Sequence, residues 1–400
     1  MKNLTKLLLA SVVSASALMA SSAVTAVKVD ANLDKVTYNS AIWSKAKTSK
    51  VMLYPQTTIK FNDKTANTLN EDAKAIEAKV AALYNGSKVA FMITWPDGTK
   101  SIQNSDKTDT YSDGFAIQFA EDFSDPKKLP YIGMGSDGRP VVIHLQKEAF
   151  GIYEPNGEGM VGYQVNPNQT DLFGKDLEKF EARVKSIASN DYEKNFVSEG
   201  FRSMTEIKDD TSKSYSRIGY ANKAWTGTLS RPLKDEYVSL NAGAFPVAFA
   251  VWDGEKMGRN GLKHLSSWVA VVLESSASKG PLVSALHDKV SGDASKGKEV
   301  VANNGCVGCH QIEATDAPNL MGPSLSNIGG YSTSDYLRES IVDPSAVVVP
   351  GYNRNAHSNY MWYTEADGKR VSTMTDYSWL EKADLEDMVA YLKTLKAEAK

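Results

Sequence analysis

The strongest chemical signal in the sequence is a pair of cysteines followed directly by a histidine. The chain has two cysteines, and both lie in the run Cys306-Val307-Gly308-Cys309-His310. This C-x-x-C-H spacing is the attachment signature of c-type haem, because two thiols one helical turn apart can each bond a haem vinyl group while the imidazole reaches the iron. A redox dithiol would be expected among alternating strands and helices, and zinc would need further ligands nearby. The run therefore predicts one covalent haem c.

The sequence around this run predicts a small helical domain. Residues 293–301 begin with Asp293, a good N-cap, and lead as a helix into the cysteine run. Residues 380–395 repeat apolar residues at helical spacing, with Glu and Lys between them. We expect the domain to cover residues 291–400.

This region resembles the class I cytochromes c. The motifs of that family occur in order: Gly-Asp-Ala at 292–294, C-x-x-C-H, Gly-Pro-Ser-Leu at 322–325, and a final Asp-Met-Val-Ala-Tyr-Leu helix. The resemblance implies attachment through Cys306 and Cys309 and one axial ligand from His310. It also implies that the carbonyl of Pro323 accepts the other ring N–H of this histidine and so fixes the imidazole.

The same resemblance implies a methionine as the second axial ligand of haem c. Met374 lies on the loop before the last helix, where such cytochromes place this sulfur, whereas Met321 and Met361 are the alternatives. A thioether opposite an imidazole favours ferrous iron, which suits electron transfer.

Upstream, residues 50–275 consist mainly of short strand-like runs separated by turn residues. The runs are 89–95, 115–120, 140–146, 237–240, 246–252 and 267–273. Residues 72–84 alternate in apolar character before Asn85-Gly86, which favours a β-hairpin over a helix. Residues 172–188 are expected to form a helix between strands. The pattern predicts a mainly antiparallel β-sandwich followed by an all-α cytochrome c domain.

Several segments of the predicted sandwich resemble one family of haem proteins. They are Arg231-Pro232-Leu233, the runs 246–254 and 259–268, and upstream 89–97 and 130–135. They are similar to the haem b γ-subunits of type II molybdenum enzymes of the DMSO reductase family, such as ethylbenzene dehydrogenase, dimethyl sulfide dehydrogenase, selenate reductase and chlorate reductase. The resemblance covers about residues 48–275.

This second resemblance implies a noncovalent haem b whose iron is held by Met134 and Lys263. A lysine can donate to iron only as the neutral amine, so burial must help to lower its pKa. Lys256 and Met257 are the alternative pair. We expect the site to lie inside the sandwich, between its sheets.

Other polar residues of this region are open to two interpretations. His144 and His264 could ligate iron or bind a propionate, but a hydrogen-bonded structural role is the more common one. Arg231, Trp252 and Arg259 could line the haem edge or a partner surface.

The first residues have the pattern of a secretory signal peptide. Lys2 and Lys6 precede an apolar run, 7–13, and small residues follow up to Ala23 and Ala26, after either of which cleavage is expected. We therefore expect a signal peptide at 1–26, a haem b domain at 27–275, a linker at 276–290 and a periplasmic protein. No later stretch approaches the length of a membrane span.

The charge of the chain argues against a nucleic-acid partner. The sequence has 45 Lys and Arg against 48 Asp and Glu, so no basic excess exists to bind a phosphate backbone. Residues 291–400 contain 10 basic and 15 acidic residues, a balance of −5 that could steer a basic redox partner.

Together the two resemblances imply a subunit that transfers electrons and does not itself catalyse a reaction. Electrons would pass between molybdenum and iron–sulfur subunits, haem b, haem c and an external carrier such as a soluble periplasmic cytochrome. Two alternatives remain: a peroxidase-type haem enzyme with an open iron position, and a ligand-binding sandwich that carries a cytochrome c tail.

Overall fold

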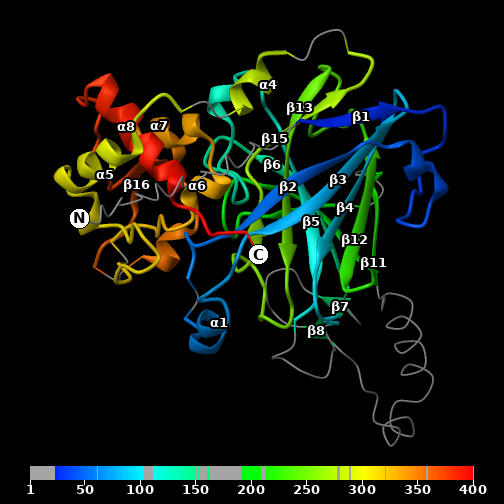
Figure 1. Ribbon diagram of the computed structural model, residues 1–400, viewed down its shortest axis with the longest axis horizontal. Helices are drawn as coiled ribbons and strands as arrows, with labels where there is room; N and C mark the ends of the chain where they lie inside the picture. Colours follow the sequence, from blue (N-terminus) through cyan, green and yellow to red (C-terminus); the bar gives the residue numbers. More distant parts are fainter. Residues whose placement is uncertain are drawn as a thin grey trace, which may run out of the picture.

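The computed structural model describes most of the chain. The described residues are 23–60, 62–102, 111–148, 152–153, 160–161, 191–208, 213–276, 280–287, 290–319, 321–356 and 359–399. The helix predicted at 172–188 lies outside them. A sheet-rich part and a helical part lie side by side (Figure 1). None of the helices in these ranges combines the length and apolarity needed to cross a membrane.

The N-terminal part is built on one large sheet of thirteen strands. They are β1 (Val24–Lys28), β2 (Thr48–Pro55), β3 (Ile76–Tyr84), β4 (Lys88–Pro96), β5 (Gly114–Ala120), β6 (Val141–Glu148), β9 (Asp191–Ser198), β10 (Thr205–Ile207), β11 (Tyr215–Ala221), β12 (Ala224–Pro232), β13 (Ala244–Trp252), β14 (His264–Leu265) and β15 (Val269–Leu273). All pairings are antiparallel except those of β1, which runs parallel to β15 and β3. The short strands β7 (Ile152–Tyr153) and β8 (Met160–Val161) pair separately.

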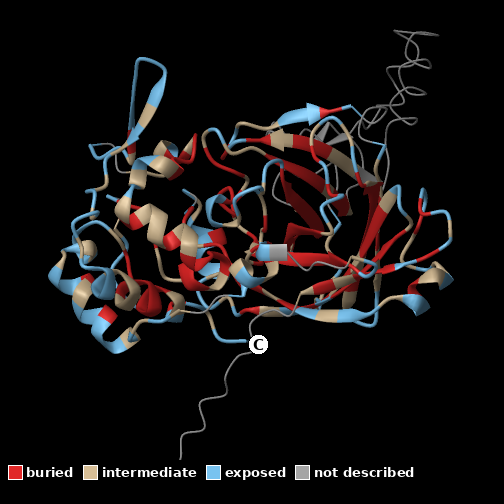
Figure 2. Cartoon of the chain, turned by 90° about the horizontal axis from the view of Figure 1, so that it is seen from above, coloured by how far each residue is buried: buried red, intermediate tan, exposed pale blue. Residues whose placement is uncertain are grey.

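The sheet folds over itself into two layers that enclose an aromatic core. The ring centroid of Phe91 on β4 lies 5.9 Å from that of Phe119 on β5 and 6.4 Å from that of Phe249 on β13. Because β4 pairs with β3 and β12, and not with β5 or β13, these rings meet across two layers, Phe119 tilted and Phe249 edge-on to Phe91. The predicted, mainly antiparallel sandwich is therefore confirmed. Figure 2 shows that many of its strands are coloured as buried along much of their length.

The hairpin predicted at Asn85-Gly86 is confirmed. Gly86 has φ +91°, and the Asn85 amide donates to the Lys88 carbonyl at 3.1 Å, which closes the turn between β3 and β4. Five of the six predicted runs are strands. The prediction at 237–240 is wrong, because Asp235 accepts the amides of Tyr237 and Val238 and holds this segment in a turn.

The C-terminal part is helical, as predicted, with one added hairpin. Its helices are α5 (Ala294–Asn303), α6 (Ile328–Tyr331), α7 (Ser334–Val342) and α8 (Lys382–Thr394), with 3-10 turns η4 (Cys306–Gly308), η5 (Pro344–Val347) and η6 (Tyr352–Asn355). The Asp293 side chain caps α5 by accepting the Ser295 amide. A Cβ on Gly297 would lie 1.8 Å from the Asp387 carbonyl oxygen, so only glycine allows α5 and α8 to cross this closely. Strands β16 (Tyr363–Ala366) and β17 (Lys369–Ser372) form the hairpin, so this part is not entirely α-helical.

Short helices flank the sheet. They are α1 (Lys64–Leu69), α4 (Gly280–Leu286), η1 (Ala41–Lys45) and η2 (Pro126–Lys128). Helix α4 occupies the segment predicted as a linker, and its Leu282 is buried against Ala244 and Val272.

The two parts share one hydrophobic core. Tyr131 of the sheet part stacks 5.4 Å from Tyr336 of the helical part. Arg139 forms two hydrogen bonds of 2.7 Å with the Glu339 carboxylate across the same interface. The cytochrome part is therefore packed on the sheet, which differs from two domains joined by a tether.

Candidate functional site

A cavity of about 410 Å³ lies on the outer face of one sheet layer, between that layer and the helical part. Strand alternation explains the room for it. On β5, Ile117 and Phe119 point into the core of the sandwich, whereas Ala116 points into the cavity. On β13, the small residues Ala248 and Ala250 also line the cavity. Large side chains therefore fill one face of these strands, and the three alanines leave space on the other.

This position corrects the expectation of a site between the sheets. The space between the layers is filled by packed rings such as Phe91, Phe245 and Phe249, so no cofactor of haem size fits there. The expectation was wrong because it assumed a hollow sandwich. The cavity lies on the opposite face of the same strands.

Met134 and Lys263 both line this cavity, although 129 positions separate them in the chain. Met134 has φ +85°, an uncommon conformation for a residue with a side chain. The next residue, Gly135, has φ +88°, and a Cβ there would lie 2.7 Å from the Ser198 carbonyl oxygen. The chain thus turns tightly at this point and holds the methionine against the cavity.

Lys263 is held from the other side, directly before β14. Its carbonyl accepts the Gln56 amide at 2.9 Å, and its Nζ lies 5.2 Å from the ring centroid of Trp252. The side chain is 8% exposed. Burial, and next the charge of Lys147, lower the pKa of Lys263 to about 8.

A second lysine, Lys147, lines the same cavity and was missed by the sequence analysis. Its Nζ lies 5.5 Å from the Trp252 ring centroid, and burial lowers its pKa to about 8, against an opposing effect of Asp113. The predicted strand ended at residue 146. Extending its alternation by one residue would have placed Lys147 on the same face as Ile143 and Leu145, which also line the cavity.

The alternative pair does not reach the cavity. Lys256 is exposed and Met257 is half-buried, and neither is among the described residues that line it.

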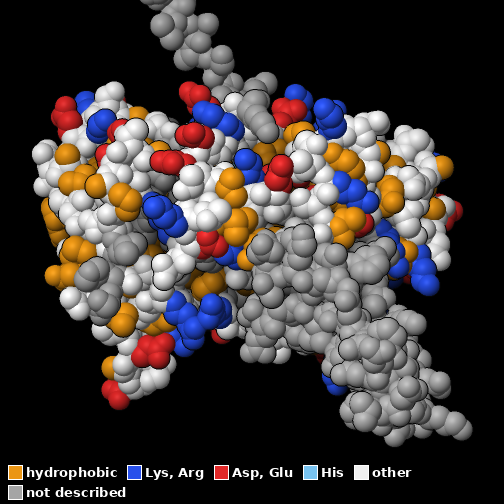
Figure 3. All heavy atoms as spheres, turned by 90° about the horizontal axis from the view of Figure 1, so that it is seen from below, with side chains coloured by type: hydrophobic (Ala, Val, Ile, Leu, Met, Phe, Trp, Pro, Cys, Tyr) orange, Lys and Arg blue, Asp and Glu red, His pale blue; other side chains and the backbone are white. Residues whose placement is uncertain are grey.

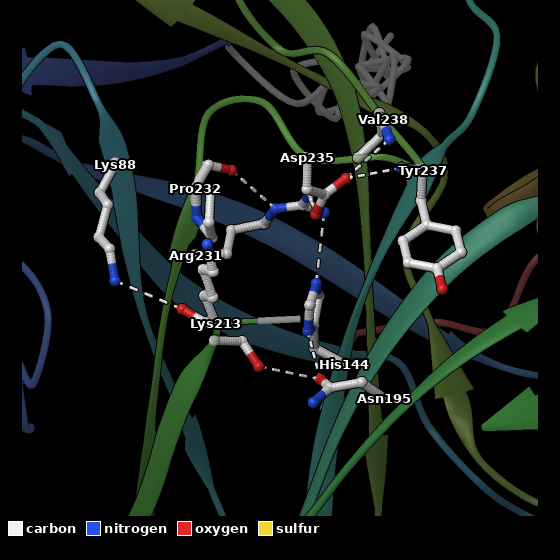
Figure 4. Close-up of polar contacts among 10 residues, drawn as sticks. Lys88, His144, Asn195, Lys213, Arg231, Pro232, Asp235, Tyr237 and Val238 are labelled. Carbon is white, nitrogen blue, oxygen red and sulfur yellow. Dashed lines mark hydrogen bonds and ion pairs between the residues drawn. The ribbon is translucent and has the colours of Figure 1, made fainter. Parts of the chain in front are cut away.

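His144 packs edge-on against Phe119 in the core of the sandwich and is not among the described residues that line the cavity. Figure 4 shows its ring between Asn195 and Arg231. Its Nδ1 contacts the Asn195 side-chain oxygen, and its Nε2 lies 3.3 Å from the Arg231 guanidinium. Burial, and next the charge of Arg231, lower the pKa of His144 to about 3. His264 Nε2 lies 3.0 Å from the Lys74 carbonyl oxygen. Both histidines thus have hydrogen-bonding roles within the fold.

Of the three residues proposed for a haem edge or partner surface, Trp252 alone lines the cavity among the described residues. Arg231, on β12, is buried in the core of the sandwich, where it pairs with Asp235 (Figure 4) and lies 4.7 Å from the Phe119 ring centroid. Arg259 pairs with Asp63.

The cysteine run forms the 3-10 turn η4, entered through Gly305 at φ +71°. Neither cysteine is in a disulfide, and Cys309 is exposed whereas Cys306 is half-buried. His310 Nδ1 lies 2.8 Å from the Pro323 carbonyl oxygen. Since a carbonyl can only accept, Nδ1 carries the proton and Nε2 keeps a lone pair for a metal. A Cβ on Gly322 would lie 2.6 Å from His310 Cε1, so this glycine is needed beside the ring.

The methionine candidates differ in exposure. Met321 is 38% exposed and Met361 is 48% exposed, whereas Met374 is half-buried. The loop of Met374 is tied to the segment directly before the cysteine run, because the Tyr377 hydroxyl donates to the Asn304 carbonyl at 2.9 Å. This favours Met374 over both alternatives.

The donors around the cavity fit the implied haem b. A thioether and an amine that loses its proton readily suit iron, and the alanine and aromatic walls suit a flat apolar ring. None of the described residues that line the cavity is an Asp or Glu.

Comparison with known proteins identifies the class. Residues 40–264 match the family model for ethylbenzene dehydrogenase, and residues 294–396 match that for cytochrome c. The first match covers more than half of the chain, so the chain belongs to the ethylbenzene dehydrogenase family and carries a C-terminal cytochrome c domain. Both resemblances predicted from the motifs are confirmed.

Two relatives are similar to separate parts of the chain. The dimethylsulfide dehydrogenase subunit gamma of Rhodovulum sulfidophilum is 28% identical over 47% of this chain and 57% of its own length. Cytochrome c oxidase subunit 2 of Alkalihalophilus pseudofirmus is 30% identical over 26% of each chain. The alignments thus span less than two thirds of either relative.

Among solved structures, a family 9 carbohydrate-binding module from Caldicellulosiruptor kristjanssonii covers 64% of this chain and 96% of its own, at 7% identity and a TM-score of 0.31. A similarity this remote has no bearing on the ligand of the cavity.

Proposed function

We propose that the chain is a dihaem electron-transfer subunit, with haem b in the cavity and haem c on Cys306 and Cys309. The observation that carries this proposal is that Met134 and Lys263, from two segments 129 positions apart in the chain, line one cavity. Membership of the ethylbenzene dehydrogenase family and the cytochrome c domain support it.

In the cavity, the Met134 sulfur and the Lys263 amine are the proposed iron ligands. The lysine must first lose its proton, and its burial among apolar walls makes this loss easier. A bound haem supplies one-electron chemistry. The task of the chain is to hold the two donors in place and to exclude water from them.

In the cytochrome part, His310 and Met374 are the proposed ligands of haem c. The Pro323 carbonyl keeps the imidazole oriented through Nδ1, which leaves Nε2 for the iron. With Met134 and Lys263 holding one iron and His310 and Met374 the other, neither iron would have an open position for a substrate, so the proposal favours electron transfer over a peroxidase-type reaction.

We further propose that the chain passes electrons between a molybdenum and iron–sulfur enzyme and a soluble carrier. A relative is named as a subunit of dimethylsulfide dehydrogenase, which supports a multisubunit partner. Hydrophobic side chains gather at the end of the molecule formed by the helical part (Figure 3), and Val307 between the two cysteines is 54% exposed. Together with the −5 balance of residues 291–400, this end suits transient contact with a basic carrier.

We place the protein in the periplasm, after removal of a signal peptide. Val24 and Ala26 are fully buried in β1, so cleavage after Ala26 would remove part of a strand, whereas cleavage after Ala23 would preserve it. We therefore propose that the haem b domain begins at residue 24, and not at residue 27 as expected from the sequence. N-terminal sequencing of the exported protein tests this choice.

Pyridine haemochrome analysis of the purified full-length protein tests the dihaem proposal. We expect one b-type and one c-type haem per chain, both six-coordinate and low-spin. Haem c alone would contradict the proposal and favour a ligand-binding sandwich with a cytochrome tail. A high-spin haem would favour the peroxidase-type alternative. Co-purification with a molybdenum-containing subunit tests the partner.

A further inference from the structure

The cytochrome part contributes an arginine to the cavity of the sheet part. Arg354 lies on η6, more than 80 residues after the last strand of the large sheet, and it lines the cavity together with Arg202 from the turn between β9 and β10. Both arginines are exposed residues and line the side of the cavity that is open to solvent.

Close backbone contacts fix the segment that carries Arg354. Gly351 has φ +81°, and a Cβ there would lie 2.1 Å from the Phe201 carbonyl oxygen. A Cβ on Gly200 would likewise lie 2.6 Å from Pro350. The Phe201 ring meets the Tyr352 ring edge-on, with centroids 6.3 Å apart. Residues 350–354 are thus held directly on the turn that carries Arg202.

The described lining of the cavity is rich in basic residues. Lys147, Lys263, Arg202 and Arg354 all line it, and its described lining contains no acidic residue. Within the described part of the chain, neither Arg202 nor Arg354 is paired with an Asp or Glu. The two arginine guanidinium groups stay charged at neutral pH, and like charges beside an apolar cavity repel one another unless an anion lies between them. An arginine fork also matches a carboxylate with two parallel hydrogen bonds.

We propose that Arg354, together with Arg202, binds carboxylate groups of the ligand in this cavity, so that the cytochrome part completes the noncovalent site of the sheet part. This inference rests on the proposed function, in which the ligand is haem b and the carboxylates are its two propionates. The apolar residues that line the cavity then hold the haem ring, and the two arginines bind the propionates at the edge of that ring.

The test measures how fast noncovalent haem leaves the full-length protein. Wild type, Arg354→Ala and Arg370→Ala are each mixed with excess apomyoglobin, and transfer of b-type haem is followed by absorbance. Arg370 is a matched control, because it pairs with Asp137 across the same interface at 2.8 Å and does not line the cavity. We expect Arg354→Ala to lose haem about fivefold faster, the size of effect typical of a partly exposed ion pair. Arg370→Ala should stay near the wild-type rate.

A second measurement separates carboxylate binding from a loss of structure. After extraction of the noncovalent haem, each protein is reconstituted with protohaem or with its dimethyl ester, whose propionates are neutral. Wild type should bind protohaem more tightly than the ester, and Arg354→Ala should lose about fivefold of this preference while binding the ester as wild type does. An unchanged preference, or equal weakening for both haems, would overturn the inference and leave the dihaem proposal intact. A wild type without b-type haem would instead overturn both.

Discussion

The two proposed haem sites are built in opposite ways. The site of haem c starts from five consecutive residues, 306–310, and its histidine is oriented by Pro323, which follows closely in the sequence. The cavity is lined by residues from Ala116 to Arg354, brought together by strands, two tight turns and the docked cytochrome part. A covalent site needs little more than a local motif, whereas a noncovalent site depends on the whole fold.

This difference predicts that each haem can be lost without the other. In the double variant Cys306→Ser/Cys309→Ser, no thioether bond can form, so we expect complete loss of covalent haem c with b-type haem retained. Pyridine haemochrome spectra measure both contents. Loss of both haems would mean that the cavity depends on a filled cytochrome site.

The converse change concerns the two lysines of the cavity. Lys263→Ala removes a proposed iron ligand, so we expect loss of most b-type haem and an unchanged content of haem c. Lys147→Ala is the matched comparison, since both amines lie over the same Trp252 ring, and it should retain a six-coordinate b-type haem. The opposite pattern in the two variants would assign the iron to Lys147.

A change of pH can test the core-facing side of this layer separately from the side that lines the cavity. The pKa of His144 is about 3 in the folded protein, against 6.5 ordinarily, so the unfolded chain binds a proton first as pH falls. The neutral imidazole makes its full contribution to the free energy of unfolding above pH 6.5, and this contribution declines as the pH falls toward 3. Between pH 6.5 and about 5, we expect the free energy of unfolding to fall by about 2 kcal/mol from this group.

His144→Phe removes this titration. Urea unfolding at the two pH values should therefore show a smaller decline for the variant than for wild type. The haem b spectrum at neutral pH should not change, because His144 points away from the cavity. Equal declines in both proteins would mean that another group dominates this range.

The smallest expected effect concerns the contact between the two parts. Arg139→Ala removes two hydrogen bonds to Glu339, and since both side chains are partly exposed we expect a loss of about 1 kcal/mol. Calorimetry should show the transitions of the sheet part and cytochrome part moving apart. Arg338→Ala breaks the pairs with Asp335 and Glu386 inside the cytochrome part, and should shift that transition alone. If both variants give the same trace, Arg139 does not couple the two parts.

The sequence was sufficient where the information is local. The cysteine run, the cap at Asp293 and the turn at Asn85-Gly86 depend on residues near one another, and each was predicted. The position of the cavity depends on which face of β5 carries Phe119 and which carries Ala116, and on where the helical part packs. No local pattern records that packing, so Arg354 could not be predicted.

The alternation along β5 and β13 has a further consequence for how this region can change. One inserted or deleted residue in either strand would exchange its two faces, bringing phenylalanines into the cavity and alanines into the dense interior. A shift in the register of either strand would therefore disrupt both the cavity and the packed core. Point substitutions at Ala116, Ala248 or Ala250, in contrast, can reshape the space for a ligand while the opposite face keeps the fold.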